Sequence, residues 1–189
     1  YRVSGLEVFG VEMDKRAADL CKRNIDLNMF KASIFNINIA NTIRELKSVS
    51  FDHVFMNPPY FKKNSVKKSH TLSSHQAKVE SMPLSAWFSV AKNRCKPNGK
   101  ITVIQRVERL PDIIKCLNGY FGQVIVQPIS SFKDTSPKTV IVQATKASGA
   151  AFKLLAPKIV HRRDGISGKV VYEDEFKKIL RYGHPLQLN

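Results

Sequence analysis

The chain has 189 residues, with 31 lysines and arginines against 15 aspartates and glutamates, which gives a formal net charge of +16. Because 43% of the residues are hydrophobic, the chain can build a core, which excludes a disordered basic tail. No apolar run approaches the roughly 18 residues of a membrane span, and the start lacks the apolar segment of a secretory signal. We therefore expect one soluble, cytoplasmic domain over residues 1–189. The surplus of positive charge favours a polyanionic partner, with nucleic acid ahead of an anionic membrane surface.

The first half of the chain alternates apolar runs with helical spacing. Residues 6–11 are predicted as a strand, and a helix follows that Asp14 caps. The predicted inner face of that helix consists of Ala17, Leu20, Cys21, Asn24, Ile25 and Asn28. An apolar stretch over 32–39 and a short polar helix over 42–47 precede a buried strand over 51–56. That strand must end at Pro58, because consecutive prolines cannot continue a sheet ladder.

The second half continues this alternation after a polar segment, 60–78, that is predicted as a surface loop. The later elements are a helix over 83–95, a turn over 96–99, a strand over 100–105, a helix over 110–117, strands over 123–129 and 139–145, and a final helix over 173–181. The order predicts an α/β fold with a mainly parallel sheet covered by helices on both faces. The last two strands have no helix between them, which predicts an antiparallel pair at the edge of the sheet.

The tetrapeptide Asn57-Pro58-Pro59-Tyr60 directly follows a predicted strand, and open α/β sheets bind their ligands beyond the carboxyl ends of strands. The two prolines remove two backbone donors and leave carbonyls that can only accept hydrogen bonds. Asn57 adds a side-chain acceptor, and Tyr60 adds an aromatic face. Such a turn can hold a planar amino group by its two hydrogens while the attached ring stacks on Tyr60. A rigid turn that merely ends the strand is the structural alternative.

With this tetrapeptide, the sequence resembles the class I methyltransferases that use S-adenosylmethionine and modify exocyclic or amide nitrogens. The resemblance implies a Rossmann-like fold and S-adenosyl-L-methionine as the cofactor. It assigns catalysis to Asn57, Pro58, Pro59 and Tyr60, and cofactor contacts to Glu12, Met13, Asn38 and Asn57. Glu12 would accept from the ribose hydroxyls and Met13 would flank the adenine. Asn38 stands where the family usually has an aspartate that contacts the adenine amino group. Glu12 as a helix-start charge and Asn38 as a turn residue remain alternatives.

Further segments resemble the valine tRNA (adenine-N6)-methyltransferases, which modify an adenine in the anticodon loop. The matching residues are Phe61, segments 100–104 and 106–110, the pairs Val160-His161 and Asp164-Gly165, and Tyr172. This resemblance implies methyl transfer to N6 of a tRNA adenine. Phe61 either lines the base pocket or packs in the protein. The family also carries a first strand and a glycine-rich turn ahead of the strand that contains Glu12. No such turn is found here, so we expect the chain to lack this strand, the turn and half of the cofactor site.

The positive charge is concentrated after the tetrapeptide. Residues 1–60 carry 8 lysines and arginines against 7 acidic residues, whereas residues 61–189 carry 23 against 8. Four lysines directly after the tetrapeptide are predicted to contact RNA phosphates, with a solvated loop as the alternative: Lys62, Lys63, Lys67 and Lys68. Weaker candidates for the same surface are Arg106, Arg109, Arg162 and Arg163. Single-stranded or loop RNA is the expected target, because the reactive base must leave its stack.

Three other functions remain open on the sequence. The same tetrapeptide can hold a glutamine amide of a protein such as a release factor, or N2 of a guanine in rRNA. A non-catalytic RNA-binding module with this fold is the third. The cysteines, Cys21, Cys95 and Cys116, form no CxxC pair and are predicted as reduced core thiols. His70 and His75 lack a third ligand candidate, so no metal site is assigned.

Overall fold

A computed structural model describes residues 5–39, 46–59 and 82–188 of the chain. Contacts divide the chain into two compact units, residues 1–50 and 51–189, which are described separately below. Within the described residues, no helix combines the length and the apolar character needed to cross a membrane. The polar segment 60–78 and most of the short helix predicted over 42–47 lie outside the described residues.

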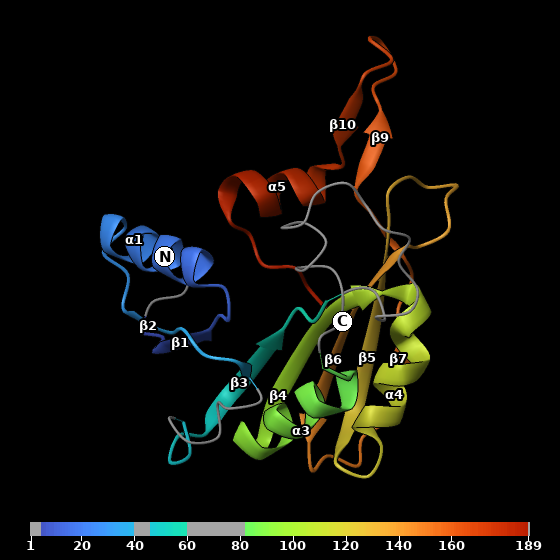
Figure 1. The fold of residues 1–189 in the computed structure, drawn as a ribbon. Helices are drawn as coiled ribbons and strands as arrows, with labels where there is room; N and C mark the ends of the chain where they lie inside the picture. Colours follow the sequence, from blue (N-terminus) through green and yellow to red (C-terminus); the bar gives the residue numbers. More distant parts are fainter. Residues whose placement is uncertain (1–4, 40–45, 60–81, 189) are drawn as a thin grey trace. The chain divides into compact units, whose positions relative to one another are not determined.

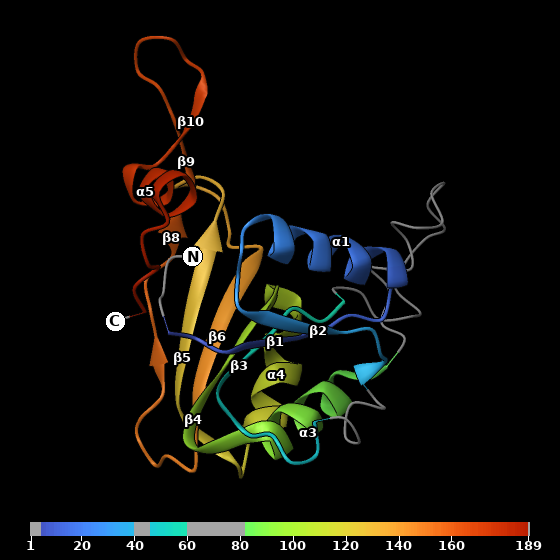
Figure 2. The same cartoon turned by 90° about the vertical axis from the view of Figure 1, so that its left-hand side faces the viewer.

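In its described residues, the first unit has two parallel strands joined by an α-helix (Figure 2). Strand β1 (Val8–Val11) pairs with β2 (Ala32–Phe35), and α1 (Lys15–Leu27) connects them. Asp14 caps the helix as predicted, because its Oδ1 accepts from the backbone N–H of Ala17 at 2.9 Å. The predicted inner face of α1 is confirmed only in part: Cys21 and Ile25 face inward together with Ala18, whereas the other predicted residues are exposed, namely Ala17, Leu20, Asn24 and Asn28. Spacings of three and four residues place the three inward side chains on one face.

The second unit is built on a six-stranded sheet (Figure 1). Its main strands are β3 (Phe51–Met56), β4 (Cys95–Arg106), β5 (Phe121–Ser130) and β6 (Thr139–Lys146), in the order β3-β4-β6-β5. Strands β3 and β4 are parallel, and β6 runs antiparallel to both β4 and β5. The predicted α/β class and antiparallel pair are confirmed. The pair does not form the edge, however, because the short strands β7 (Lys153–Leu154) and β8 (Lys158–Ile159) add in parallel to the outer side of β5.

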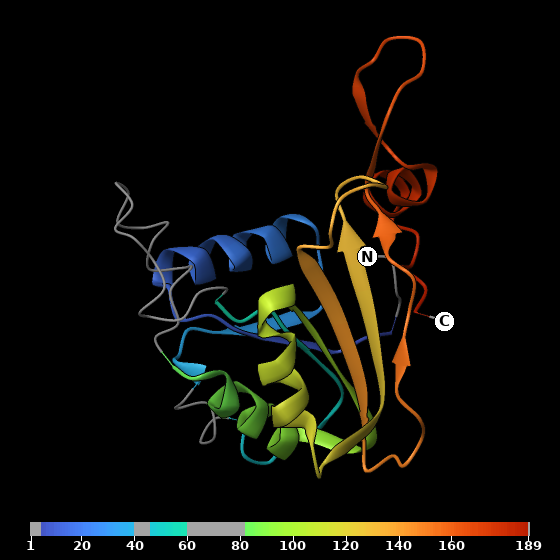
Figure 3. The ribbon, with the colours of Figure 1, turned by 90° about the vertical axis from the view of Figure 1, so that its right-hand side faces the viewer.

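Two helices cover one and the same face of this sheet (Figure 3). They are α3 (Leu84–Arg94) and α4 (Leu110–Leu117), and the 3-10 turn η2 (Val107–Arg109) leads into α4. Between helices and sheet lies the apolar core, which includes Leu84, Phe88, Ala91, Ile101, Val103, Ile113, Leu117, Val126, Val140 and Val142. Burial of each large side chain of this kind contributes about 1.5–3 kcal/mol, so this core anchors the ends of β3 and β4.

The predicted turn over 96–99 lies inside β4 as a bulge rather than before the strand. Phe51 pairs with Cys95 and His53 with Lys100, so four residues of β4 face one residue of β3. Asn98 adopts a φ of 62° there. The Nζ of Lys96 lies 2.9 Å from the Asp52 carboxylate, and this hydrogen bond lowers the pKa of Asp52 below its ordinary value. The bulge leaves the register of the carboxyl halves of β3 and β4 regular up to Val103.

A hairpin and a helix extend beyond the carboxyl end of β5 (Figure 3). They are β9 (His161–Arg163), β10 (Val170–Tyr172) and α5 (Asp174–Tyr182), which confirms the predicted final helix within one residue. The ring of His161 stacks on Tyr172, with centroids 5.0 Å apart, and lies 5.8 Å from the ring of Phe132. These rings attach the base of the hairpin to the end of β5.

Candidate functional site

The carboxyl ends of β3, β4 and β5 lie at the same edge of the sheet. This follows from the register, because β3 and β4 are parallel and both β4 and β5 are antiparallel to β6. Asn57, Pro58 and Pro59 directly follow β3 at this edge. Ligands of open α/β sheets bind at such an edge, so the tetrapeptide begins where a substrate is expected.

Asn57 and the two prolines differ sharply in exposure. Asn57 is exposed, and its side chain makes no hydrogen bond within the described part of the chain, whereas Pro58 is fully buried and Pro59 is half-buried. The acceptor oxygen of Asn57 is therefore open to a ligand. Six other predicted site residues lie outside the described residues: Tyr60, Phe61, Lys62, Lys63, Lys67 and Lys68.

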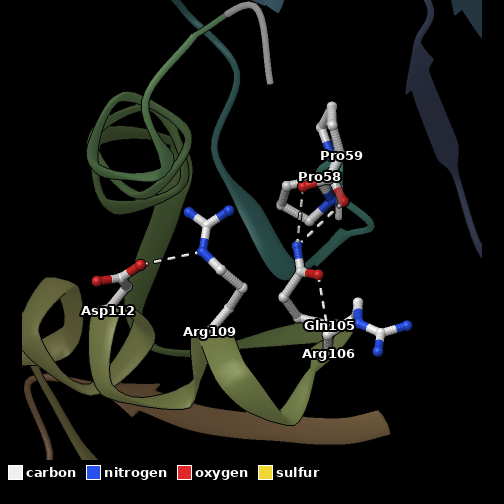
Figure 4. A network of polar contacts seen from close by, with 6 residues as sticks. All are labelled: Pro58, Pro59, Gln105, Arg106, Arg109 and Asp112. Carbon is white, nitrogen blue, oxygen red and sulfur yellow. Dashed lines mark hydrogen bonds and ion pairs between the residues drawn. The ribbon is translucent and has the colours of Figure 1, made fainter. Parts of the chain in front are cut away.

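The turn is held by Gln105, the penultimate residue of β4 (Figure 4). Its Nε2 donates to the carbonyl oxygens of Pro58 and Pro59, both at 3.2 Å. Its Oε1 accepts from the backbone N–H of Arg106 at 2.9 Å. Gln105 has no exposed surface. Gln105 was not predicted as a site residue, although a glutamine at a buried position in the alternating pattern of β4 is a usable signal.

Two arginines that were predicted to face RNA lie at the end of β4 and in η2, and they differ in burial. Arg109 is 6% exposed, and its Nε lies 3.0 Å from Oδ2 of Asp112, so its assignment to an RNA-contacting surface is wrong (Figure 4). Arg109 lies in the 3-10 turn that leads into α4, and its side chain is buried there. Arg106 pairs with Glu108 at 3.2 Å. A backbone hydrogen bond at Glu108, reinforced by Arg106, lowers the pKa of the Glu108 carboxyl.

In the first unit, Glu12 and Met13 follow β1, and Asn38 lies after β2. The carboxylate of Glu12 accepts from the backbone N–H of Asp14 at 2.8 Å, while Met13 is 59% exposed. The Nδ2 of Asn38 lies 3.5 Å from Sδ of Met13. Asn36, which the sequence analysis did not single out, donates from Nδ2 to the carbonyls of Glu12 at 2.9 Å and Met13 at 3.0 Å. The fold therefore brings the three predicted cofactor residues of this unit together, and Asn36 donates to the backbone of two of them.

The sequence of residues 2–110, more than half of the chain, matches the family model of N-6 DNA methylases. The chain belongs to this family. It is also 35% identical over 74 residues to MJ0046 of Methanocaldococcus jannaschii, whose name assigns it provisionally to the methyltransferases. That match covers 38% of the chain and 28% of the relative, so the chain aligns with little more than a quarter of that protein.

Solved structures show the fold of this N-6 DNA methylase family member. Atu636 of Agrobacterium tumefaciens, described as a predicted O-methyltransferase, superposes with a TM-score of 0.72 at 19% identity, over 95% of the chain and 79% of Atu636. The tRNA (m1A58) methyltransferase TrmI of Aquifex aeolicus gives a TM-score of 0.51 at 11% identity, over 75% of the chain and 54% of TrmI. The predicted Rossmann-like methyltransferase fold is confirmed.

S-adenosyl-L-methionine is the cofactor of this family, and the residues of the first unit fit its adenosine part. The Glu12 carboxylate is an acceptor suited to ribose hydroxyls, and the exposed Met13 thioether offers an apolar surface for a purine ring. Asn38 lies beside Met13, with its Nδ2 3.5 Å from Sδ of Met13, and its side-chain amide carries an oxygen of the acceptor type that suits an adenine amino group.

Proposed function

We propose that the protein transfers the methyl group of S-adenosyl-L-methionine to N6 of an adenine in tRNA, with both units belonging to one catalytic domain. The acceptor turn carries this proposal. Asn57 presents a side-chain oxygen that accepts no hydrogen bond within the described residues, and two proline carbonyls follow it at the carboxyl edge of the sheet. A turn that offers acceptors in this number suits a ligand that brings two hydrogens on one nitrogen, as an exocyclic amino group does. Membership of the N-6 DNA methylase family supports an adenine amino group as that ligand.

The chemistry follows from the weakness of an aromatic amino nitrogen as a nucleophile. Its lone pair is delocalised into the ring, and acceptance of both hydrogens by Asn57 Oδ1 and a proline carbonyl of the turn draws the nitrogen toward tetrahedral geometry. The bound cofactor supplies an electrophilic methyl group. With the cofactor bound, the nitrogen–carbon bond would form as the carbon–sulfur bond breaks, the electron pair of that bond would stay with sulfur, and the extra proton would leave the nitrogen for water. Tyr60 is proposed to stack on the base, with Phe61 beside it.

The distribution of charge supports RNA as the substrate. Residues 61–189 carry 23 lysines and arginines against 8 acidic residues, which favours binding to a phosphate backbone. Lys62, Lys63, Lys67 and Lys68 follow the residues that would hold the base, so the same segment would meet its phosphates. The hairpin after β5 adds exposed Arg163 and Lys169, and β5 ends at the same edge of the sheet as β3.

Product analysis tests this proposal. The intact protein is incubated with methyl-labelled S-adenosyl-L-methionine and one of three acceptors: an unmodified tRNA transcript, an adenine-containing DNA strand or a glutamine-containing peptide. Digestion of the tRNA to nucleosides is expected to place the label in N6-methyladenosine. Label found in the DNA, in methylglutamine or in N2-methylguanosine would show that the acceptor carrying it, and not a tRNA adenine, is the substrate. Binding of tRNA without any transfer would favour a non-catalytic module.

A further inference from the structure

The proline pair cannot satisfy its own carbonyl groups. Pro58 and Pro59 have no N–H, and the fully buried Pro58 is shielded from water. A buried carbonyl without a donor costs about 1–3 kcal/mol, so the turn needs a donor from elsewhere in the chain. Gln105 is that donor, because the two hydrogens on its Nε2 serve the two carbonyls separately.

The backbone fixes the orientation of the Gln105 amide. The N–H of Arg106 can only donate, so the oxygen of the Gln105 amide must face it, at 2.9 Å, and the nitrogen must face the prolines. Gln105 is completely buried, which excludes water from taking its place. Both ends of the amide are therefore used, and the side chain has one defined arrangement (Figure 4).

We propose that Gln105 is a positioning residue for methyl transfer: through the Pro58 and Pro59 carbonyls it holds the turn, and Asn57 beside it, where a substrate amino group binds. This inference rests on the proposed function. Each carbonyl oxygen has two lone pairs, of which Gln105 uses one. On the half-buried Pro59 the second lone pair is left for a substrate hydrogen, whereas the bond to the buried Pro58 carbonyl fixes the turn. Displacement of a reactive group by about 1 Å lowers a rate by roughly a hundredfold. We therefore expect kcat to depend on the hydrogen bonds by which Gln105 holds this turn.

The chain contains a matched control for this role. Gln127 of β5 is 1% exposed, and its Nε2 donates to the carbonyls of Pro128 at 3.0 Å and Ala156 at 2.8 Å. It thus has the same burial and the same pair of hydrogen bonds, including one to a proline, but it holds β5 to the segment after β7 rather than the acceptor turn. Replacement of either glutamine by methionine keeps the side-chain volume and removes the donor.

The test compares Gln105→Met with Gln127→Met in the intact protein. We measure kcat, KM for the acceptor, affinity for S-adenosylhomocysteine and the unfolding temperature of each variant. Both variants are expected to unfold at comparably lower temperatures. Gln105→Met lowers kcat by about tenfold or more with cofactor affinity within about twofold, whereas Gln127→Met keeps kcat within about twofold. An unchanged kcat in Gln105→Met, or an equal loss in both variants, would overturn the assignment.

The variant Gln105→Glu allows a second test, the pH dependence of kcat, which a purely structural role of Gln105 would not affect. A carboxyl buried against two carbonyls is protonated more readily than in water, and only its protonated form can donate to them. The kcat of this variant, divided by that of the wild type, is therefore expected to rise as the pH falls from about 8 to about 6. A ratio that does not change with pH would contradict the donor role of Gln105.

The acceptor chosen by the wild-type protein separates this inference from the proposed function. All variants are assayed on whichever of the tRNA, the DNA strand and the peptide the wild type methylates fastest. The identity of that acceptor decides the proposed function, and the ratio of kcat between the two methionine variants decides the role of Gln105. Transfer to none of the three would overturn both.

Discussion

Each unit holds its site segment with one side-chain amide that donates to two successive carbonyls. Asn36 holds Glu12 and Met13 at 2.9 and 3.0 Å, and Gln105 holds Pro58 and Pro59 at 3.2 Å. The difference lies in burial: Asn36 is exposed, whereas Gln105 has no exposed surface. Water can replace the donor in the first unit but not in the second. The predicted cofactor segment can therefore adjust, while the acceptor turn is fixed in advance.

The two units also differ in how many apolar side chains they bury, and the first unit buries fewer. Ala18 is the only buried residue of α1, and Leu6, Met13, Leu20 and Met29 of the first unit are exposed. The second unit packs α3 and α4 on its sheet through a continuous apolar core. A segment with few buried apolar contacts opens at low cost in free energy, so we expect the first unit to become more protected against hydrogen exchange when cofactor binds.

The largest effect is expected from Asn57→Ala, which removes the exposed acceptor of the turn. One hydrogen bond formed in the transition state contributes about a hundredfold to a thousandfold in rate, so kcat should fall by about that factor. The unfolding temperature should stay near that of the wild type, because the Asn57 side chain is exposed. Radiometric methyl-transfer kinetics measure kcat, and a thermal melt checks the fold.

Asn93→Ala is the control for Asn57→Ala. Asn93 is also an exposed asparagine of the second unit, but it lies near the end of α3 and not at the acceptor turn. Its kcat should equal that of the wild type. Equal kcat values in the two variants would show that Asn57 does not take part in catalysis.

The next effect concerns RNA affinity and the basic segment after the turn. When alanine replaces all four lysines, Lys62, Lys63, Lys67 and Lys68, the fall of log affinity with log salt should become shallower by about 3. The reason is that each phosphate contact on a single strand contributes about 0.7 to this slope. Filter binding of tRNA over a salt series measures the slope. The control replaces four exposed basic residues of α1 and should leave the slope unchanged: Lys15, Arg16, Lys22 and Arg23. Equal slopes in the two variants would argue against a specific role for the segment.

A smaller effect is expected from Asn36→Ala, because water can take over its hydrogen bonds. Loss of about 1 kcal/mol would weaken affinity for S-adenosylhomocysteine about fivefold. Calorimetric titration measures this affinity. In Asn28→Ala, which removes an exposed amide that donates to the Asn24 carbonyl at the end of α1, the affinity should not change. A loss in Asn36→Ala larger than that in Glu12→Ala would contradict the adjustable character of this segment.

The smallest effect is expected from Asp14→Ala, which removes the N-cap of α1. The free energy of unfolding of the first unit should fall by about 1 kcal/mol, while kcat at saturating cofactor should not change. Hydrogen exchange of the amides of α1 measures the loss. A fall in kcat at saturating cofactor would show that Asp14 acts in the reaction rather than in folding.

The sequence predicted the parts of the molecule that depend on local rules. The limits of β3 and α4 agree with the predicted ranges, because apolar runs, prolines and helical spacing determine them. Contacts between distant residues could not be predicted in this way. The donor to Pro58 lies 47 residues along the chain in Gln105, and Asn36 lies 24 residues from Glu12. Arg109 was assigned to the surface because charge alone does not reveal the 3-10 turn that buries it.

The division of labour between the two units is tested most directly by S-adenosylhomocysteine binding to Glu12→Ala and Asn57→Ala. Loss of the carboxylate from the first unit should weaken this affinity by about tenfold to a hundredfold, the equivalent of about 1.5–3 kcal/mol for hydrogen bonds to a charged group. Asn57→Ala should bind S-adenosylhomocysteine within about threefold of the wild type and yet fail to transfer methyl groups. Unchanged binding in Glu12→Ala, or lost binding in Asn57→Ala, would contradict the assignment of cofactor to the first unit and methyl acceptor to the second.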